Sequence, residues 1–282
     1  MEDEALRPLQ TGEVRLRMHG LQGADDEGVP AAVFAQKLGA LVRGLRAADA
    51  ALNGKSRHDY VITDLRMGSA IVELRELRPH PAHLIPPTSG IEAFDICVEA
   101  VQIGKVDEAQ RFGATPKHIQ QLARGSGNKF GYGELWLDRD QPLRVDEFLF
   151  EQSRKFIEGP RFDTYLPTRH KWYSGIAHGI FDGVVKGVDL RGALPEVKLV
   201  LTAGGRQIDC IFRNVEIEAI RHALDRRVRV EGTAYYDGSS GLPRRLEVNA
   251  IHSVAKPRDF TRWRGTFEPF VAPDWDDDLE HE

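Results

Sequence analysis

The sequence predicts an α+β protein, in which a mixed N-terminal domain precedes a compact β-rich domain. In the first half of the chain, segments with an apolar residue at every second position alternate with segments whose apolar residues recur every three or four positions. These are the periods of strands and helices. Five strand-like segments and one short helical segment follow between residues 174 and 256. A chain of 282 residues, 41% of them hydrophobic, is long enough for two separate cores.

The N-terminal domain is expected to begin with a β-α-β-β unit. Residues 14–19 alternate strictly and predict a half-buried strand. Residues 60–66 and 70–77 are also strand-like, and the short connection 67–69 predicts a hairpin. Between these strands, a helix begins at Pro30 and ends at Asn53-Gly54, with an apolar stripe that consists of Phe34, Leu38, Leu41, Leu45, Ala48 and Leu52.

Further helices and strands complete this domain, which we expect to span residues 1–158. Ser89 is the expected N-cap of a second helix. Thr115 is the expected N-cap of a shorter helix, with Pro116 at its first position. Residues 132–137 and 143–150 have the character of strands that flank a turn, and the proline-containing segment 159–173 predicts a linker.

The C-terminal domain, residues 174–256, is expected to have the order β-β-β-α-β-β. The predicted strands are 178–189, 197–201, 206–213, 227–236 and 244–254, and the helix is 216–224. Gly179, Gly183 and Gly187 lie in the first strand, and strand glycines are typical of the bulges that a small barrel needs. The remaining segment, 257–282, is acidic and predicts a disordered tail.

The C-terminal segments resemble the OB-fold, a five-stranded Greek-key barrel with a helix between its third and fourth strands. The resemblance lies in the sequences GIFDGVV at 179–185, IDCIF at 208–212, RVRVEG at 227–232 and LEVNAI at 246–251, and it covers under a third of the chain. It implies a five-stranded OB-like β-barrel that binds nucleic acids, sugars or proteins. Phe181 and Phe212 have the parity of buried positions, so we assign them to the core.

The resemblance and the outward positions of the strands predict a surface for single-stranded DNA or RNA. Cations that follow a backbone and an aromatic ring that stacks a base are the usual chemistry of such surfaces. The expected contact residues are Lys198, Arg213, Arg227, Arg229, Tyr235, Arg244 and Arg245. A solvated barrel exterior is the alternative, because acidic residues are interleaved with these cations: Asp209, Glu231 and Glu247.

The first strand offers a second candidate surface for phosphate. Arg15, Arg17 and His19 share one of its faces. A solvated face is the favoured interpretation, since alternating charge is what a half-exposed strand displays.

Composition excludes several classes of protein. No run of 18 apolar residues is present, so we expect no membrane span. The acidic start Met1-Glu2-Asp3-Glu4 is unlike a secretory signal. Two cysteines form neither a disulfide framework nor a zinc cage. We therefore expect a cytoplasmic protein without a metal or cofactor, and a net charge of −5 that gives no overall attraction to nucleic acid or lipid.

The acidic tail is a candidate site for a protein partner. It is similar to the acidic tails of bacterial single-stranded-DNA-binding proteins, which recruit partners and compete with DNA. It departs from them by ending in Glu282 rather than in a hydrophobic residue. A disordered, solubilising terminus is an equal alternative. The residues concerned are Asp274, Trp275, Asp276, Asp277 and Asp278.

Weaker motifs point to phosphate, metal or nuclease chemistry. The glycine-rich loop 124–131 has amides suited to a phosphate, but a hinge or flexible loop is favoured. Asp189 with Glu196 and Lys198 fits the loose pattern of metal-dependent nucleases. We set less weight on the remaining combinations, which are Asp64 with Glu73 and Arg75, Arg111 with His118, and the metal-ligand pair His80 and His83.

The sequence therefore predicts a non-catalytic accessory protein that binds nucleic acid through its C-terminal barrel. The alternative is a protein-interaction or assembly module of a larger complex, favoured by the negative charge and the sparse basic surface. A metal-dependent nuclease is the third interpretation.

Overall fold

The computed structural model describes residues 7–21, 28–66, 70–77, 88–137, 141–158, 172–238 and 240–254. This part of the chain contains two five-stranded sheets and six helices, which confirms the α+β prediction. The predicted connection 67–69, the residues His80 and His83, most of the predicted linker and the tail with Asp274, Trp275, Asp276, Asp277 and Asp278 lie outside the described residues.

The N-terminal sheet has the strand order β2-β3-β1-β4-β5 and is antiparallel throughout. Its strands are β1 (Glu13–His19), β2 (Asp59–Arg66), β3 (Ile71–Leu77), β4 (Tyr132–Trp136) and β5 (Leu143–Val145). With α1 (Ala31–Asn53) between β1 and β2, the predicted β-α-β-β order is confirmed.

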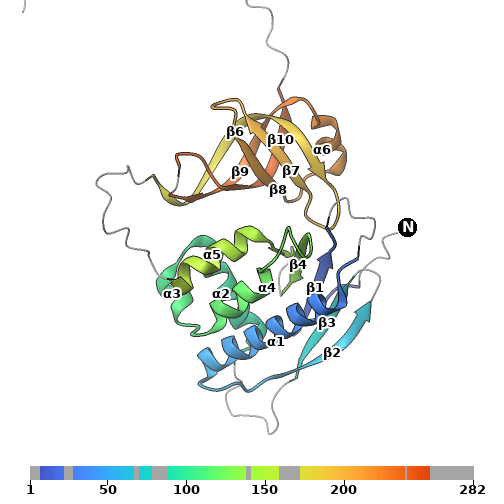
Figure 1. Ribbon diagram of the computed structural model, residues 1–282, viewed down its shortest axis with the longest axis vertical. Helices are drawn as coiled ribbons and strands as arrows, with labels where there is room; N and C mark the ends of the chain where they lie inside the picture. Colours follow the sequence, from blue (N-terminus) through green and yellow to red (C-terminus); the bar gives the residue numbers. More distant parts are fainter. Residues whose placement is uncertain are drawn as a thin grey trace, which may run out of the picture.

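Helices cover one face of this sheet (Figure 1). They are α1, α2 (Gly90–Ile103), α4 (Thr115–Ala123) and α5 (Glu147–Glu158), and the short α3 (Val106–Gln110) packs on α2 and α5. Apolar side chains of β1, among them Val14 and Leu16, pack with the helices in one core. The buried Lys37 amino group of α1 donates hydrogen bonds to the carbonyls of Gln121 and Arg124 at the end of α4. These hydrogen bonds of a charged side chain thus join α1 to the C-terminal end of α4.

Of the two N-cap residues predicted from the sequence, one is confirmed and one is wrong. The predicted cap Ser89 is confirmed, because its side chain accepts hydrogen bonds from the amides of Ile91 and Glu92 at 3.2 and 3.4 Å. The predicted cap Thr115 is wrong: Ala114 is the N-cap, and the Thr115 hydroxyl donates to the Phe112 carbonyl at 2.8 Å.

The predicted strand 143–150 is wrong beyond its first three residues. β5 ends at Val145, and α5 begins at Glu147. The cause is Asp146, whose carboxylate accepts a hydrogen bond from the Leu149 amide at 3.1 Å and so caps the helix. A single capping residue thus converts the second half of an apolar segment from strand to helix.

The C-terminal strands close into a ring in the order β10-β8-β7-β6-β9. They are β6 (Ser174–Asp189), β7 (Glu196–Leu201), β8 (Gln207–Phe212), β9 (Arg227–Asp237) and β10 (Arg245–Ser253), with α6 (Ile217–Ala223) between β8 and β9. β10 pairs with β8 in parallel, and the other pairs are antiparallel. Gly232 allows the close approach of β9 to β10, because a Cβ atom there would meet the Glu247 carbonyl oxygen at 2.0 Å. Phe212 is buried in this barrel and Phe181 packs against its core, as predicted.

The barrel lies against the N-terminal domain (Figure 1). The connection between β6 and β7 reaches β4, where the amides of Ala193 and Leu194 donate to the buried Glu134 carboxylate at 2.7 and 3.2 Å. The Tyr132 hydroxyl donates to the Arg191 carbonyl beside them. Among the described helices, none is long and apolar enough to cross a membrane.

Candidate functional site

The seven barrel residues predicted to contact nucleic acid fall on two separate surfaces. Five of them face the N-terminal domain: Lys198, Arg213, Tyr235, Arg244 and Arg245. Arg227 and Arg229 instead lie near Asp182, at N–O distances of 3.6 and 3.2 Å. Tyr235 is six residues beyond Arg229 on β9, which is roughly 20 Å along a strand. The predicted residues therefore do not form one continuous surface.

Arg245 is buried between the two domains. Only 3% of the residue is exposed, and its Nη1 atom lies 3.3 and 3.0 Å from the two carboxylate oxygens of Asp146. Its guanidinium also packs over the Phe148 ring of α5, with the central carbon 4.9 Å from the ring centroid. The same Phe148 ring meets the buried Tyr235 edge-on at 5.4 Å. The expected exposure of Arg245 and Tyr235 is wrong because α5 covers this side of the barrel.

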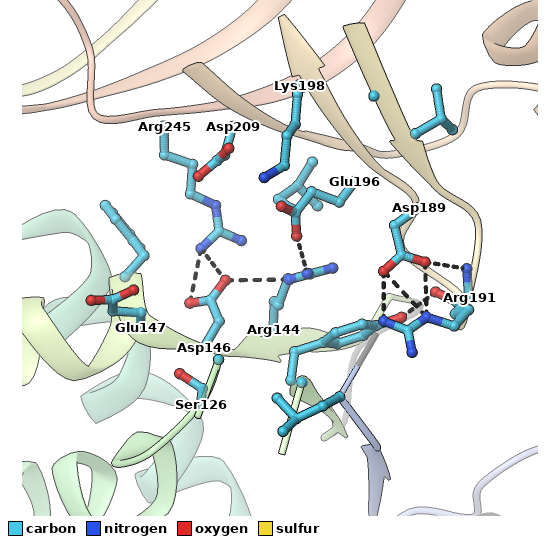
Figure 2. A pocket seen from close by; sticks show the side chains of 18 of the residues that line it. Ser126, Arg144, Asp146, Glu147, Asp189, Arg191, Glu196, Lys198, Asp209 and Arg245 are labelled. Carbon is cyan, nitrogen blue, oxygen red and sulfur yellow. Dashed lines mark hydrogen bonds and ion pairs between the residues drawn. The ribbon is translucent and has the colours of Figure 1, made fainter. Parts of the chain in front are cut away.

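Asp146 joins the two domains through its carboxylate (Figure 2). It caps α5, receives Arg245 from the barrel, and lies 3.3 Å from Nε of Arg144. Arg144 in turn donates to the Leu194 carbonyl at 3.2 Å and to the Glu196 carboxylate, both on the barrel side. Both buried arginines are thus ion-paired, as burial of a charge requires, although Nε of Arg144 and Nε and Nη2 of Arg245 have no hydrogen-bond partner among the described residues.

The aromatic rings in this region are already occupied. Arg144 packs over the Tyr132 ring, with its guanidinium carbon 3.8 Å from the centroid, and the His19 ring stacks on Tyr132 at 4.3 Å. Both faces of Tyr132 are therefore in use and do not stack a nucleobase. Burial raises the pKa of Glu196, although Arg144 beside it acts in the opposite direction.

A cleft of about 600 Å³ separates the domains at this point. The barrel contributes Lys198, Asp209 and Arg245, which are cross-strand neighbours on β7, β8 and β10. The opposite wall includes Ser126 and Glu147 of the N-terminal domain (Figure 2). Five cations and five carboxylates line the cleft, and they are Arg144, Arg191, Lys198, Arg244, Arg245, Asp146, Glu147, Asp189, Glu196 and Asp209.

The glycine-rich loop borders the cleft through Ser126, Gly127 and Gly131. Its amides, however, donate to backbone carbonyls: Ser126 to Ala123, Gly127 to Phe130, and Gly131 to His19. The amides of residues 128 and 129 both donate to the carbonyl of residue 125. This loop is a closed turn, so its backbone does not offer the phosphate cradle that its glycines suggest.

The three residues of the strongest nuclease pattern do reach the same cleft. Asp189 accepts hydrogen bonds from the amide and side chain of Arg191, and Glu196 is bound by Arg144. Lys198 lies on the same wall. Within the part of the chain that the structure describes, no three His, Cys, Asp or Glu side chains are grouped to hold a metal ion. The carboxylates serve as ion-pair and hydrogen-bond partners of arginine here.

Four residues of the two weaker nuclease combinations are also bound by structural partners. Glu73 is buried and bound by Arg15, while Arg75 binds Glu13 at 2.7 Å. Asp64 pairs with Arg66 on β2. His118 lies 3.3 Å from the Gln121 side chain on α4. Each residue thus has a structural contact of its own.

The predicted solvent-facing surface of β1 is wrong for Arg15 and only partly right for the others. Arg15 is 4% exposed, and its Nε and Nη2 atoms donate to one Glu73 oxygen at 2.8 and 2.6 Å. Arg17 is half-buried, and the His19 ring lies 3.1 Å from Glu134. The second face of β1 is buried because its neighbours Glu73 and Glu134 are in turn covered by Arg7 and by the connection between β6 and β7.

A cluster of aromatic side chains at the end of the barrel was missed by the sequence analysis. Trp172 and Tyr173 are 54% and 57% exposed, and Tyr173 meets Tyr236 of β9 at 5.4 Å in an edge-on contact. We call Trp172, Tyr173 and Tyr236 the aromatic patch. The signal was present, since Trp172 and Tyr173 are adjacent in the sequence, but both fell within the predicted linker.

The aromatic patch adjoins the connection between β9 and β10. Gly241 lies directly under Trp172, because a Cβ atom there would meet the indole ring at 3.0 Å. The neighbouring Ser240 hydroxyl accepts a hydrogen bond from the exposed Arg206 at 2.9 Å. An exposed cation and exposed aromatic rings therefore share this end of the barrel.

Comparison with known proteins finds no family model and no curated protein that matches this chain.

Proposed function

We propose that the protein is a non-catalytic accessory protein that binds single-stranded nucleic acid at the aromatic patch. The observation that carries the proposal is the exposure of Trp172 and Tyr173, 54% and 57%, beside the β9–β10 connection. Successive bases stack on such rings without regard to sequence, because every base has a π face.

We further propose that the barrel is an OB-fold. Its helix α6 lies between the third and fourth strands, and its ring closes between the first and fourth, β6 and β9. The third and fifth strands, β8 and β10, pair in parallel. These pairings support a five-stranded Greek-key barrel of this class.

The position of the patch suits an OB-fold. Such barrels hold ligands with the face of strands two and three and with the loops after strands one and four. The loop after strand one is hydrogen-bonded to Glu134, and the face of β7 and β8 borders the N-terminal domain. The loop after strand four adjoins the aromatic patch. It lies away from Glu134, the residue to which the loop after strand one is hydrogen-bonded.

Binding by full-length protein tests the proposal. Fluorescence anisotropy would use labelled single-stranded DNA, single-stranded RNA and duplex DNA at 50 and 200 mM salt. Wild-type protein is expected to prefer single strands. Trp172→Ala should weaken binding by about tenfold, in line with roughly 1–3 kcal/mol per stacked base, with an unchanged salt slope. Arg206→Gln should lower the slope of log K against log salt by about 0.7.

Two matched variants serve as controls. Ile180→Ala removes an exposed apolar side chain on β6, outside the aromatic patch, and Arg229→Gln removes an exposed barrel cation that pairs with Asp182. Both should bind like wild type. If Arg229→Gln weakens binding and Trp172→Ala does not, the site is the exposed pair Arg227 and Arg229 and not the aromatic patch.

The assembly-module alternative is favoured by a different surface. β2 is an edge strand of the N-terminal sheet, and Val61, Ile62 and Leu65 on it are 39%, 53% and 47% exposed. Edge strands with apolar side chains are templates for an added strand. Under this alternative, light scattering would find a stable oligomer and the anisotropy experiment would find no nucleic-acid binding.

A further inference from the structure

The interdomain cleft has the size and the chemistry of a small-molecule site. Its volume of about 600 Å³ lies inside the range of roughly 300–1,000 Å³ for ligand pockets. Ligand pockets also favour the boundary between domains, where two rigid walls converge. The charged side chains of this cleft decide which ligand it suits.

Six of the ten charged side chains that line the cleft are partners of one another. Arg144 binds Asp146 and Glu196, Arg245 binds Asp146, and Arg191 binds Asp189. The other four make no ion pair with any described residue, and they are the cations Lys198 and Arg244 and the carboxylates Asp209 and Glu147. The cleft thus presents both signs of charge to a ligand.

Arg245 has a vacant hydrogen-bonding edge. Its Nη1 atom is bound to Asp146, but its buried Nε and Nη2 atoms have no hydrogen-bond partner among the described residues. These two N–H groups point the same way and form the planar fork that binds phosphate or carboxylate in a bidentate manner. An unsatisfied buried donor destabilises the folded protein, so a ligand that accepts these hydrogen bonds would remove that penalty.

The opposite wall carries a second unsatisfied group. The Ser126 hydroxyl, on a residue only 6% exposed, has no hydrogen-bond partner among the described residues and borders the same cleft. Figure 2 shows Arg245, Asp209 and Lys198 on the barrel wall and Ser126 with Glu147 on the facing wall. Groups that need a partner therefore converge from both domains.

The carboxylates that line the cleft disfavour a simple inorganic anion as its ligand. Asp209 is the cross-strand neighbour of both Lys198 and Arg245, so an isolated phosphate between these cations would meet a negative charge. A ligand with hydroxyl groups close to its phosphate avoids this conflict, because hydroxyls donate hydrogen bonds to carboxylates. Ribose phosphates combine these groups, and an acidic side chain is a common partner of ribose hydroxyls.

We propose that the interdomain cleft binds a ribonucleotide, with its phosphate on the Arg245 fork and Lys198 and its ribose hydroxyls on Asp209. The ligand would contact both domains at once and so hold them in this arrangement. This site is separate from the aromatic patch and does not depend on the binding of single strands there.

Calorimetric titration of the full-length protein tests this site with AMP, GMP, CMP, UMP, ribose 5-phosphate and inorganic phosphate. We expect at least one nucleotide to bind at least tenfold more tightly than inorganic phosphate. Lys198→Gln and Asp209→Asn, which change exposed side chains, should each weaken that nucleotide at least tenfold. Arg229→Gln and Trp172→Ala should leave its affinity unchanged.

Three results would overturn the proposal. The first is an absence of both binding heat and a rise in Tm with every nucleotide at about 5 mM, since a ligand of the native state raises Tm. The second is inorganic phosphate that binds as tightly as the nucleotides. The third is nucleotide binding that both Lys198→Gln and Asp209→Asn leave intact. Loss of single-strand binding in Trp172→Ala, by contrast, tests only the aromatic patch.

Discussion

Two aspartates of this protein each lie between two arginines, and their surroundings differ. Asp146 binds Arg144 and Arg245, whose side chains are both 3% exposed. Asp182 binds Arg227 and Arg229, whose side chains are 42% and 54% exposed. The composition of the two clusters is the same, yet one lies between the domains and the other on the surface of the barrel.

Burial determines what each cluster contributes to stability. An exposed ion pair is screened by water and contributes about 0–1 kcal/mol. A buried pair costs desolvation energy when it forms, but removing one partner leaves an uncompensated charge inside the protein. The proximity of an arginine to an aspartate therefore does not predict how much the pair stabilises the fold. That contribution depends on whether other helices and strands bury the pair.

The largest effect is expected for Asp146→Ala. It leaves Arg245 and Arg144 buried without their shared carboxylate and removes the cap of α5. We expect a loss of about 3–5 kcal/mol in the free energy of unfolding, measured by urea titration at pH 7. A loss below about 1 kcal/mol would show that water reaches this cluster and screens it.

A third cluster of the same kind sharpens the comparison. Glu13 is fully buried and binds Arg7 and Arg75, whose side chains are 37% and 47% exposed. Burial alone would raise the pKa of Glu13, but hydrogen bonds from Arg7, the Gln10 amide and Arg75 lower it to about 2. In the exposure of its side chains, the Glu13 cluster is therefore intermediate between the Asp146 cluster and the Asp182 cluster.

The lowered pKa gives Glu13 a defined pH dependence. Its contribution is present above the ordinary carboxyl pKa of about 4.5 and is lost as pH falls toward 2, because the unfolded chain takes up the proton first. Because Arg7 and Arg75 are half-exposed and water screens their charges, the contribution at pH 7 should be well below the roughly 3 kcal/mol that the full shift would imply. Unfolding of wild type and Glu13→Gln, measured from pH 7 down to pH 3, should give stabilities that converge. A difference that stays constant with pH would contradict this assignment.

The smallest effect is expected for Asp182→Ala. Its two arginines remain solvated, so the free energy of unfolding should change by no more than about 0.5 kcal/mol. Urea titration beside Asp146→Ala gives the direct comparison. A change as large as that of Asp146→Ala would mean that exposure does not separate the two clusters.

Much of the fold follows from local pattern. The order of β1, α1, β2 and β3 and the five strands of the barrel could be predicted, because alternation and helical period extend over six or more residues in most of them. α3 has five residues, too few for a period to appear. The β5–α5 junction was missed because Asp146, the capping signal, lies between apolar residues that also suit a strand.

The site was much less predictable. Alternation states correctly that Tyr235 points out of the barrel, but it does not state that α5 covers both Tyr235 and Arg245. Contacts between Phe148 and Tyr235 join residues 87 positions apart, and no local period encodes such packing. Likewise, nothing in the alternation of β1 indicates that Glu73 faces Arg15.

The shared carboxylate of Asp146 also bears on how the chain folds. α5 belongs to the N-terminal domain, yet the residue that starts it is also the counter-ion of a barrel arginine. Separating the domains would leave Arg245 without its partner and expose the β4 surface that binds Ala193 and Leu194. Opening the interface therefore costs free energy, and we expect the two domains to unfold together as a single cooperative unit.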